Sequence, residues 1–573
     1  MPTKTMTGAT VADAYLQLLA DRGVDYFFAN AGTDFAPIIE SFAKAQALDT
    51  PVPEPVTVPH ENTAVHMAMG YYFMTGRPQA VMVHVNVGTA NGLNGLLNAK
   101  RGQIPVFFTA GRTPTNEDAS LPGHRSLDIH WTQEMFDQAG MVREAVKWDY
   151  ELRNGEQVET VVDRGLTIAM SEPRGPVYLS LPREVLSHPM ASYSYTSPTR
   201  QKPATPARPD PDAVDEIASL LAKARNPLIL TGSGGRTAAA WHALSDLAER
   251  YALPVIQHRF RILSLATHHP MNMGYGQEGW VSDADVILVV DTAAPYVPAQ
   301  HRLRDDCKVI HIGPDPLHSY VPIRGIPADI ALTCGTAEGL EAIGDALESH
   351  AIAARDQIEA RRKALAERQR KLHAGWDARL EDARNQPVIH PAWLSHCISE
   401  AKNEDAVVIQ EAKLLTSHMR FDHPQTLWNP GAASGLGHGL GAALGVKLAA
   451  PDRQVIGVHG DGAYMFGNPV SAHYVAAEQN LPHLSIILNN GRWQAVRGAT
   501  VGQNRDGYAA RSNRQPLTFL DAIDGYEKVV EAAGGYGEKV TDPADLPRAI
   551  DRALKVVEIE KRQAVLNVIC STG

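Results

Sequence analysis

The sequence predicts an α/β protein of three domains, each built on a doubly wound parallel sheet. Short apolar segments alternate with helical segments along the chain, and many of the apolar segments end at turns rich in glycine, asparagine or aspartate. This alternation is typical of parallel strands joined by crossover helices. A length of 573 residues is too great for one hydrophobic core. We place the domains at residues 1–189, 208–345 and 376–573.

The first predicted domain opens with Thr10 and Asp13, which form a capping-box pattern ahead of an amphipathic helix. Its helices are expected at 63–75 and 158–170, and its strands at 25–29, 56–58, 80–85 and 105–109. The first three strands run into polar turns, 30–34, 59–62 and 86–91. The carboxyl ends of parallel strands share one edge of a sheet, where ligands bind in such folds. A Ser-, Thr- and Pro-rich linker, 190–212, follows.

The second predicted domain begins with a helix at 212–224 and a strand at 227–230. The strand ends in Gly232-Ser233-Gly234-Gly235-Arg236-Thr237, which is nearly a dinucleotide fingerprint. Thr237, however, stands where the third glycine belongs. We interpret this turn as a tight connection before a packed helix, with nucleotide binding as the alternative. Further strands are expected at 286–290 and 308–312, and a charged, solvated helical connection at 350–375.

The third predicted domain contains the stretch that is most informative about chemistry. A strand at 455–458 runs into Gly460-Asp461-Gly462, a helix follows at 469–479, and a strand at 484–488 ends on Asn489-Asn490. This strand–helix–strand unit brings Asp461 and Asn490 to the same sheet edge. Carboxylate and amide oxygens suit a hard divalent cation that also holds phosphate oxygens. The polar, Arg-rich segment 491–520 has the composition of a mobile lid.

Composition excludes several other classes of protein. A net charge of −11 without a basic block argues against a nucleic-acid partner. No run of 18 apolar residues predicts a membrane span, and the N-terminus has no apolar signal-peptide region. The cysteines lie far apart without metal-ligand spacing, which favours reduced thiols in a cytoplasmic protein. They are Cys307, Cys334, Cys397 and Cys570.

The Gly-Asp-Gly to Asn-Asn spacing resembles the binding signature of thiamine-diphosphate (ThDP) enzymes of the decarboxylase and acetolactate-synthase type. The likeness extends over nearly the whole chain and would make its domains the pyrimidine-binding, central and diphosphate-binding domains of that family. Pro59-His60-Glu61, followed by a small-residue helix and Thr75-Gly76-Arg77-Pro78, is similar to the activating-glutamate segment. The resemblance assigns Glu61 to N1′ of the cofactor. In the family this glutamate comes from a neighbouring subunit, which implies a homo-oligomer, expected as a dimer of dimers (a homotetramer).

Other assignments follow from the same resemblance. The segment Ser434-Gly435-Leu436-Gly437 matches the one that receives the pyrimidine, with the Ser434 carbonyl accepting from the 4′-amino group and Leu436 bending the cofactor. Asp461, the Asn490 side chain and the Arg492 backbone carbonyl match the Mg²⁺ ligands. The expected contacts to the diphosphate come from Gly460, Gly462, Ala463 and the residues near Ala412-Lys413-Leu414.

The type of reaction rests on a mosaic of similarities. The segment 84–91 looks most like benzoylformate decarboxylase, which has a catalytic histidine at the position of His84, and Thr33 replaces that enzyme's active-site serine. A histidine at a strand end can move protons. The second catalytic histidine of that enzyme has no counterpart near Pro298, and Gln133-Glu134 is instead similar to acetolactate synthases.

We therefore expect a ThDP- and Mg²⁺-dependent enzyme that acts on a small 2-oxo acid or acyl donor by decarboxylation, carboligation or both. Acetolactate synthase proper is the first alternative. The second is a 2-hydroxyacyl-CoA or oxalyl-CoA lyase, which needs a CoA site in the middle domain. The third is a pyruvate-oxidase-type flavoprotein, which would be yellow when purified.

Overall fold

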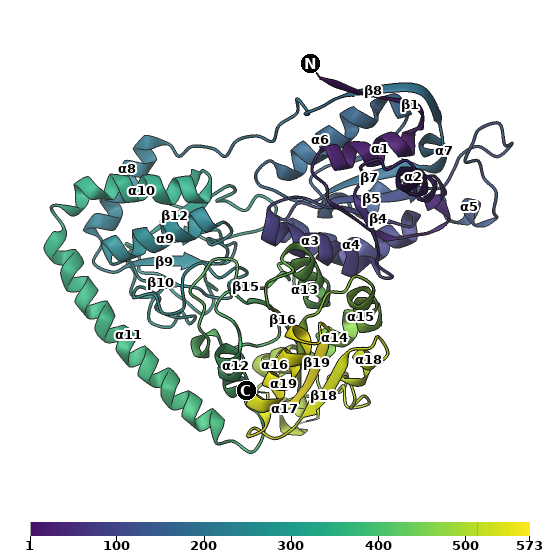
Figure 1. Cartoon of the computed structure of the whole chain (residues 1–573). Helices are drawn as coiled ribbons and strands as arrows, with labels where there is room; N and C mark the ends of the chain where they lie inside the picture. Colours follow the sequence, from purple (N-terminus) through teal and green to yellow (C-terminus); the bar gives the residue numbers. More distant parts are fainter. Residues whose placement is uncertain (1, 513, 573) are drawn as a thin grey trace. The chain divides into compact units, whose positions relative to one another are not determined.

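A computed structural model describes residues 2–512 and 514–572 of the chain. The chain divides into two compact units (Figure 1). The first comprises Met1–Ala204, Pro430–Lys539 and Arg552–Val568, and the second comprises Thr205–Asn429, Val540–Asp551 and Ile569–Gly573. Three main sheets, of six, five and six strands, confirm the predicted α/β class with parallel sheets. The domain boundaries placed from the sequence stay a prediction.

The first sheet has the strand order β3-β2-β4-β5-β7-β6, and all its pairs are parallel. Its strands are β2 (Tyr26–Asn30), β3 (Glu54–Thr57), β4 (Ala80–Val83), β5 (Phe107–Arg112), β6 (Asp149–Glu151) and β7 (Val177–Pro182). The helices of this region are α1 (Val11–Asp21), α2 (Ala36–Ala47), α3 (Glu61–Thr75), α4 (Val85–Gly102), α5 (Ile129–Thr132), α6 (Val158–Met170) and α7 (Arg183–Leu186). Asn30 is in register with Val83, so the residues that follow β2 and β4 share one sheet edge.

Two features of this region concern predictions made from the sequence. The capping box is confirmed, because the Thr10 side chain accepts from the Asp13 amide and the Asp13 carboxylate accepts from the Thr10 amide. The linker prediction is wrong at its start, because Pro189–Thr196 forms β8, which pairs antiparallel with β1 (Thr3–Thr10). Its composition is that of a linker, but alternate tyrosines place Tyr195 inside the core, and burial outweighs composition.

The strand predicted at 80–85 is shorter than expected, and the predicted turn 86–91 is helical. β4 ends at Val83 and α4 begins at Val85, with His84 as the N-cap residue. The reason is a side chain distant in sequence: the Asp34 carboxylate accepts a hydrogen bond from the Val85 amide at 3.2 Å. This contact satisfies one of the free amides at a helix N-terminus and starts the helix early.

The first unit also contains a close helix–helix contact between α3 and α13 (His438–Ala449). A Cβ atom at Gly441 would lie 2.6 Å from the Thr63 carbonyl oxygen, and one at Gly445 would lie 2.0 Å from the Met67 carbonyl oxygen. From the other side, a Cβ at Gly70 would lie 2.3 Å from the Ala442 carbonyl oxygen. Glycine spacing at four-residue intervals therefore lets the two backbones touch.

The second unit is built on a five-stranded parallel sheet of order β10-β9-β11-β12-β13. Its strands are β9 (Pro227–Thr231), β10 (Val255–Ile256), β11 (Val286–Val290), β12 (Lys308–Gly313) and β13 (Ile330–Thr333). Its helices are α8 (Pro211–Lys223), α9 (Ala238–Tyr251), α10 (Thr336–Ala351), α11 (Arg355–Arg384) and α12 (Pro391–Ala401). The long, largely exposed α11 includes most of the charged segment predicted at 350–375 (Figure 1).

The glycine-rich turn after β9 has a structural explanation. Thr237 is the N-cap of α9 and accepts a hydrogen bond from the Ala240 amide at 3.2 Å. A Cβ at Gly235 would lie 2.4 Å from the Leu263 carbonyl oxygen. The glycine serves close backbone packing at this turn, and the threonine ends the turn by capping the helix, in agreement with the structural interpretation of this segment.

The third sheet contains β14 (Val407–Glu411), β15 (Leu427–Trp428), β16 (Val455–Gly460), β17 (Leu484–Asn489), β18 (Tyr536–Val540) and β19 (Ala564–Ile569). In the first unit the order is β16-β17-β19-β18, and in the second unit β14 pairs in parallel with β15. The helices are α14 (Asp461–Phe466), α15 (Pro469–Glu478), α16 (Gln494–Gln503), α17 (Tyr508–Ser512), α18 (Lys528–Glu531) and α19 (Leu546–Glu558). Asp461 is thus the first residue of a short helix directly after β16.

The segment predicted as a lid contains the helices α16 and α17, and neither buries a side chain. Its base is closed by backbone hydrogen bonds from Trp493 to Thr518 at 2.7 Å and from Leu520 to Gly491 at 2.7 Å. The lid function stays a prediction. All four cysteines are free thiols. Among the described helices, none combines the length and apolar character that crossing a bilayer requires.

Candidate active site

Glu61 is the first residue of α3 and lies at the carboxyl edge of the first sheet, with 7% of its surface exposed. The Asn30 amide group donates to its Oε1 at 2.8 Å, and the Asn91 amide group donates to its Oε2. A Cβ at Gly88 would lie 3.2 Å from Oε1, so the glycine leaves space over the carboxylate. Two side-chain amides therefore hold a buried carboxyl group in one orientation.

His84 follows β4 at the same sheet edge and has hydrogen-bond partners on both ring nitrogens. Its Nδ1 lies 2.5 Å from Asp34 Oδ1, and its Nε2 lies 3.1 Å from the Gln133 amide nitrogen. This arrangement assigns the proton of the neutral ring to Nδ1, because Gln133 donates to Nε2. The hydrogen bond to Asp34 raises the pKa of His84, and burial opposes it. A substrate group that displaced Gln133 would meet an imidazole nitrogen able to take or give a proton.

Two glycines make room for the Asp34–His84 pair. A Cβ at Gly32 would lie 2.1 Å from the His84 ring, and a Cβ at Gly111 would lie 1.8 Å from Asp34 Oδ2. Thr33 lies between Gly32 and Asp34 at the start of a 3-10 turn and is exposed. The turn after β2 thus brings one buried acid to the histidine and leaves Thr33 at the surface of the same edge.

Asp461 and Asn490 lie together at the carboxyl edge of the third sheet, as their positions after β16 and β17 predict. Asp461 Oδ2 and Asn490 Oδ1 both accept from the Arg492 amide, each at 3.2 Å. The Gly462 amide donates to Asp461 Oδ1 at 2.8 Å. Only 3% of Asp461 is exposed, and burial raises its pKa while the surrounding backbone amides oppose this. An oxygen of the buried Asp461 carboxylate and the Asn490 side-chain oxygen therefore both point toward the Arg492 N–H.

The glycines around Asp461 differ in what they permit. At Gly460 a Cβ would meet open space, whereas at Gly462 it would lie 2.3 Å from the Trp493 indole ring. Gly462 is therefore required by the packing of Trp493 as well as by any approach of a phosphate. Ala463 is buried in the first turn of α14. The positive φ of Gly491, 67°, turns the chain so that the Arg492 amide points back at Asp461.

Three asparagines of the first sheet's helices hold the segment that the resemblance assigns to the pyrimidine. Asn98 Oδ1 accepts from the Ala433 and Gly435 amides at 3.1 and 3.2 Å, and its amide donates to the Gly435 carbonyl at 2.9 Å. The Leu436 carbonyl accepts from Asn94 at 2.9 Å and from Asn62 at 3.4 Å. Three polar side chains thus fix the backbone of this segment.

Within this segment, the residues assigned to the cofactor are accessible. Ser434 is exposed and has a φ of 61°, and its amide donates to the Gly431 carbonyl at 2.9 Å. Leu436 is half-buried, so its side chain is available for contact with a ligand. A non-glycine residue with positive φ is uncommon, and its backbone strain costs on the order of 1 kcal/mol. The hydrogen bonds from Ala433 and Gly435 to Asn98, on either side of Ser434, offset this cost.

Ala412 and Lys413 belong to the second unit, in the loop after β14. The Ala412 carbonyl accepts from the Leu414 amide at 2.9 Å and from the Gln410 side chain at 3.1 Å, which tightens the loop into a turn. Lys413 is exposed. Their contact with a diphosphate stays a prediction.

Sequence reasoning missed the residues that hold the predicted ones in place. Asp34 could have been predicted, because it is an acid in the polar turn after β2. Gln133 could be found only from the family resemblance of its segment. The amides around Glu61 and around the 433–437 segment carry no signal, because asparagine is common in loops and helix caps. The missed residues are Asn30, Asp34, Asn62, Asn91, Asn94 and Asn98.

The arrangement fits the groups that the resemblance implies. Within residues 2–512 and 514–572 no three His, Cys, Asp or Glu residues gather as metal ligands, so a cation near Asp461 would rest on one carboxylate plus amide and backbone oxygens. That donor set suits Mg²⁺, which keeps other positions for phosphate oxygens and water. Glu61, buried beneath Gly88, would accept a proton from a protonated ring nitrogen. His84 would exchange protons with a substrate.

Comparisons with known proteins bear on the same regions. Three family models match in order along the chain: "Thiamine pyrophosphate enzyme, N-terminal TPP binding domain" at residues 9–141, the central domain at 214–343, and the C-terminal TPP binding domain at 411–568. Glu61 and His84 lie in the first matched region, and Asp461 and Asn490 lie in the third.

Individual relatives match over most of the chain. The acetolactate synthase large subunit of Haemophilus influenzae is 25% identical, over 95% of this chain and 92% of that protein. Benzoylformate decarboxylase of Pseudomonas aeruginosa is 27% identical, over 85% of this chain and 87% of that protein.

Two solved structures have the same fold. They are the 4-hydroxybenzoylformate decarboxylase of Rhodococcus jostii RHA1 (TM-score 0.76, 22% identity, 98% of this chain and 99% of that one) and the benzoylformate decarboxylase of Polynucleobacter necessarius (TM-score 0.79, 21% identity, 99% of both).

Proposed function

Because this chain belongs to the thiamine pyrophosphate enzyme family, of the decarboxylase and carboligase type, we propose that it is a ThDP- and Mg²⁺-dependent enzyme acting on a small 2-oxo acid. It cleaves or forms the carbon–carbon bond next to the carbonyl group. The observation that carries the proposal is the state of Glu61: a buried carboxylate held by Asn30 and Asn91 under a glycine, at the edge that also holds His84. ThDP, when bound, supplies the nucleophilic carbon.

Each residue has a distinct role in this proposal. Glu61 would exchange a proton with N1′ of the cofactor, Leu436 would pack against the cofactor, and the Ser434 carbonyl would accept from its 4′-amino group. Asp461, Asn490 and the Arg492 carbonyl would hold Mg²⁺, and Gly460, Gly462 and Ala463 would contact the diphosphate. His84 gives and takes protons at the substrate, with Thr33 beside it.

The Asp34–His84–Gln133 arrangement supports chemistry on a polar carbonyl substrate. A neutral imidazole with Nδ1–H bound to a carboxylate keeps Nε2 as the reactive atom. Its raised pKa makes it a better base and a weaker acid at neutral pH. Release of Gln133 from Nε2 would couple the entry of a substrate to the availability of this nitrogen. Among the relatives, several are named for synthesis of acetolactate and one for decarboxylation of benzoylformate, and both reactions fit this chemistry.

The proposed reaction is tested by loading the purified chain with ThDP and Mg²⁺ and incubating it with aliphatic and aromatic 2-oxo acids, and separately with acyl-CoA thioesters. Release of CO₂ is followed together with carboligation products. Turnover of 2-oxo acids supports the proposal. Turnover confined to acyl-CoA thioesters, or a tightly bound flavin with oxidase activity, would replace it by one of the alternatives.

We also propose a homo-oligomer in which the site uses two chains. In this structure Asn62 and Asn94 contact Leu436 of the same chain. A separate experiment therefore shows which chain of the oligomer supplies Glu61 to each site. Glu61→Gln and Asp461→Ala chains are each made, then unfolded and refolded together. If each site combines two chains, mixing restores about a quarter of the wild-type sites, since half the dimers are mixed and each has one intact site. No restoration would place the whole site in one chain.

A further inference from the structure

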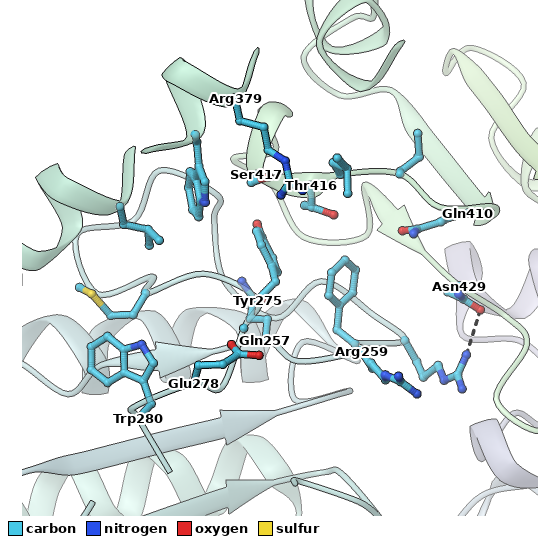
Figure 2. Close-up of a pocket in the computed structure, with 18 residues that line it drawn as sticks. Gln257, Arg259, Tyr275, Glu278, Trp280, Arg379, Gln410, Thr416, Ser417 and Asn429 are labelled. Carbon is cyan, nitrogen blue, oxygen red and sulfur yellow. Dashed lines mark hydrogen bonds between the residues drawn. The ribbon is translucent and has the colours of Figure 1, made fainter. Parts of the chain in front are cut away.

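A cavity of about 690 Å³ in the second unit is lined by none of the residues assigned above to a metal or substrate, and it shares one wall, at Leu414, with the loop predicted to contact the diphosphate (Figure 2). Its walls come from the segment after β10, the loop 273–280, the C-terminal half of α11 and the loop after β14. The glycine-rich turn Gly232–Thr237 does not line it. This volume lies within the range of small-molecule sites, roughly 300–1,000 Å³.

Three guanidinium groups line this cavity: Arg259, Arg261 and Arg379. Among the described residues, no carboxylate forms an ion pair with any of the three, and Arg261 donates instead to the Asn429 side chain at 3.2 Å (Figure 2). Burial lowers the pKa of Arg261, and the nearby charge of Arg259 adds to this effect. A chain with a net charge of −11 thus gathers unpaired positive charge in one concave place. Arg261 is half-buried, whereas Arg259 and Arg379 are exposed and free to pair with an anion that enters the cavity.

The backbone at Arg259 gives a second, independent indication. Its φ is 45°, in the left-handed region that a residue with a Cβ rarely adopts. Strain of this kind costs roughly 1–3 kcal/mol and is concentrated at functional sites. At this position a glycine would be unstrained, but the chain has an arginine whose side chain lines the cavity.

Aromatic rings form the other walls. The Tyr275 ring is stacked against the Trp376 ring, with 6.3 Å between centroids and 25° between planes, and Phe260 lies 5.9 Å from Tyr275. Figure 2 shows the Tyr275 hydroxyl directed toward Thr416 and Ser417 across the cavity. Flat faces beside guanidinium groups select a planar ring that carries negative charge.

We propose that this cavity binds a small aromatic carboxylate, with the ring against Tyr275 and Trp376 and the carboxylate on Arg259 and Arg379. Glu278 also lines the cavity and lowers its net positive charge, which favours a ligand of low charge over a polyphosphate. A nucleotide would in addition need the phosphate-binding turn that the lining lacks. The proposal concerns binding alone, so it stands or fails independently of the proposed reaction.

The test is calorimetric titration of the full-length protein, with ThDP and Mg²⁺ present, using benzoate as the probe. We expect saturable binding at one site per chain. Cyclohexanecarboxylate, with equal charge but no aromatic face, and benzamide, with the ring but no charge, should each bind at least about tenfold more weakly. The double variant Arg259→Gln/Arg379→Gln should also bind benzoate at least about tenfold more weakly.

The matched control is Arg302→Gln, which removes an arginine whose side chain is 91% exposed and should leave benzoate affinity unchanged. Trp376→Leu removes the stacking face without altering charge and should weaken benzoate binding while leaving the affinity for cyclohexanecarboxylate unchanged. Thermal unfolding of each variant checks that it is folded. Equal benzoate affinity in the double variant and the wild type would overturn the proposal. So would tighter binding of ADP than of benzoate, which would make the cavity a nucleotide site.

Discussion

Glu61 and Asp461, two buried carboxylates of the first unit, lie in equivalent places but in different surroundings. Each is the first residue of a helix at the carboxyl edge of a parallel sheet. Glu61 is held by the side chains of Asn30 and Asn91, whereas Asp461 is held by backbone amides, including those of Gly462 and Arg492. One site is built from dispersed side chains, and the other is built largely from local backbone.

This difference suits the two roles proposed for the acids. A metal site needs oxygens at fixed positions, and backbone amides next to the ligand fix them without adding charge. A proton-transfer site needs a carboxyl group aimed at one atom of its partner, and side-chain amides can orient that group without adding charge. Four substitutions test this contrast.

The largest effect is expected at Glu61. Glu61→Gln keeps the size of the side chain but cannot accept a proton from N1′, so exchange of the C2 proton of bound ThDP should fall by at least about a hundredfold. The affinity for ThDP should change far less. Exchange is measured by NMR after acid quench. The control is Glu54→Gln, an exposed glutamate in β3. Exchange at the wild-type rate would remove Glu61 from the reaction.

His84→Ala should separate activation of the cofactor from turnover of the substrate. C2 exchange should persist, because it depends on Glu61, whereas steady-state turnover of an accepted 2-oxo acid should fall by roughly a hundredfold. Exchange and turnover are measured on the same preparation, with His188→Ala, an exposed histidine, as control. Turnover at the wild-type rate on every accepted substrate would mean that His84 is structural. The likeness to benzoylformate decarboxylase would then be local.

Asp461→Ala should weaken the binding of ThDP. Removal of the carboxylate is expected to weaken ThDP affinity by about 10–100-fold at ordinary Mg²⁺ concentration, the scale seen when metal-site groups are lost. A chelator should reduce wild-type affinity to a similar level and have little further effect on the variant. Affinity is measured by calorimetry, with Asp452→Ala, an exposed aspartate, as control. An unchanged affinity with and without chelator would contradict the metal assignment.

The smallest effect is expected for Asp34→Asn, and it concerns pH. The Asp34 carboxylate holds the pKa of His84 above its usual range, so a reaction that needs neutral His84 loses rate as pH falls through this raised value. The variant should shift that acid limb to lower pH and reduce turnover by about tenfold, since the ring also loses its orientation. Asp49→Asn, at an exposed position, is the control. A pH profile that does not move would separate Asp34 from the function of His84.

The same pair links pH to stability. Because the folded pKa of His84 is raised, the ion pair stabilises the fold fully below the ordinary histidine pKa, about 6.5. That contribution is lost as pH rises through the raised value. Urea unfolding at a series of pH values should therefore show a larger destabilisation by Asp34→Asn in acid than in weak base.

The sequence by itself determined the fold class and the relative positions of Asp461 and Asn490, the two residues predicted to hold a metal. Alternating strands and helices require parallel sheets, and the distance from Asp461 to Asn490 is one strand–helix–strand unit, whose geometry is local and regular. For this reason the order of residues along the chain is enough to place Asp461 and Asn490 side by side. In the folded protein both side chains accept from one amide, that of Arg492.

Only the tertiary structure decided which side chains contact His84 at the carboxyl edge of the first sheet. Asp34 is 50 residues from His84 in the chain and Gln133 is 49, and no periodicity links them. Gly32 and Gly111 look like ordinary turn glycines in the sequence, yet each leaves the volume that one member of the Asp34–His84 pair fills. The start of α4 at Val85 has the same origin, because a distant carboxylate caps it. Side-chain packing between strand ends is set by long-range contacts, which local patterns in a sequence do not encode.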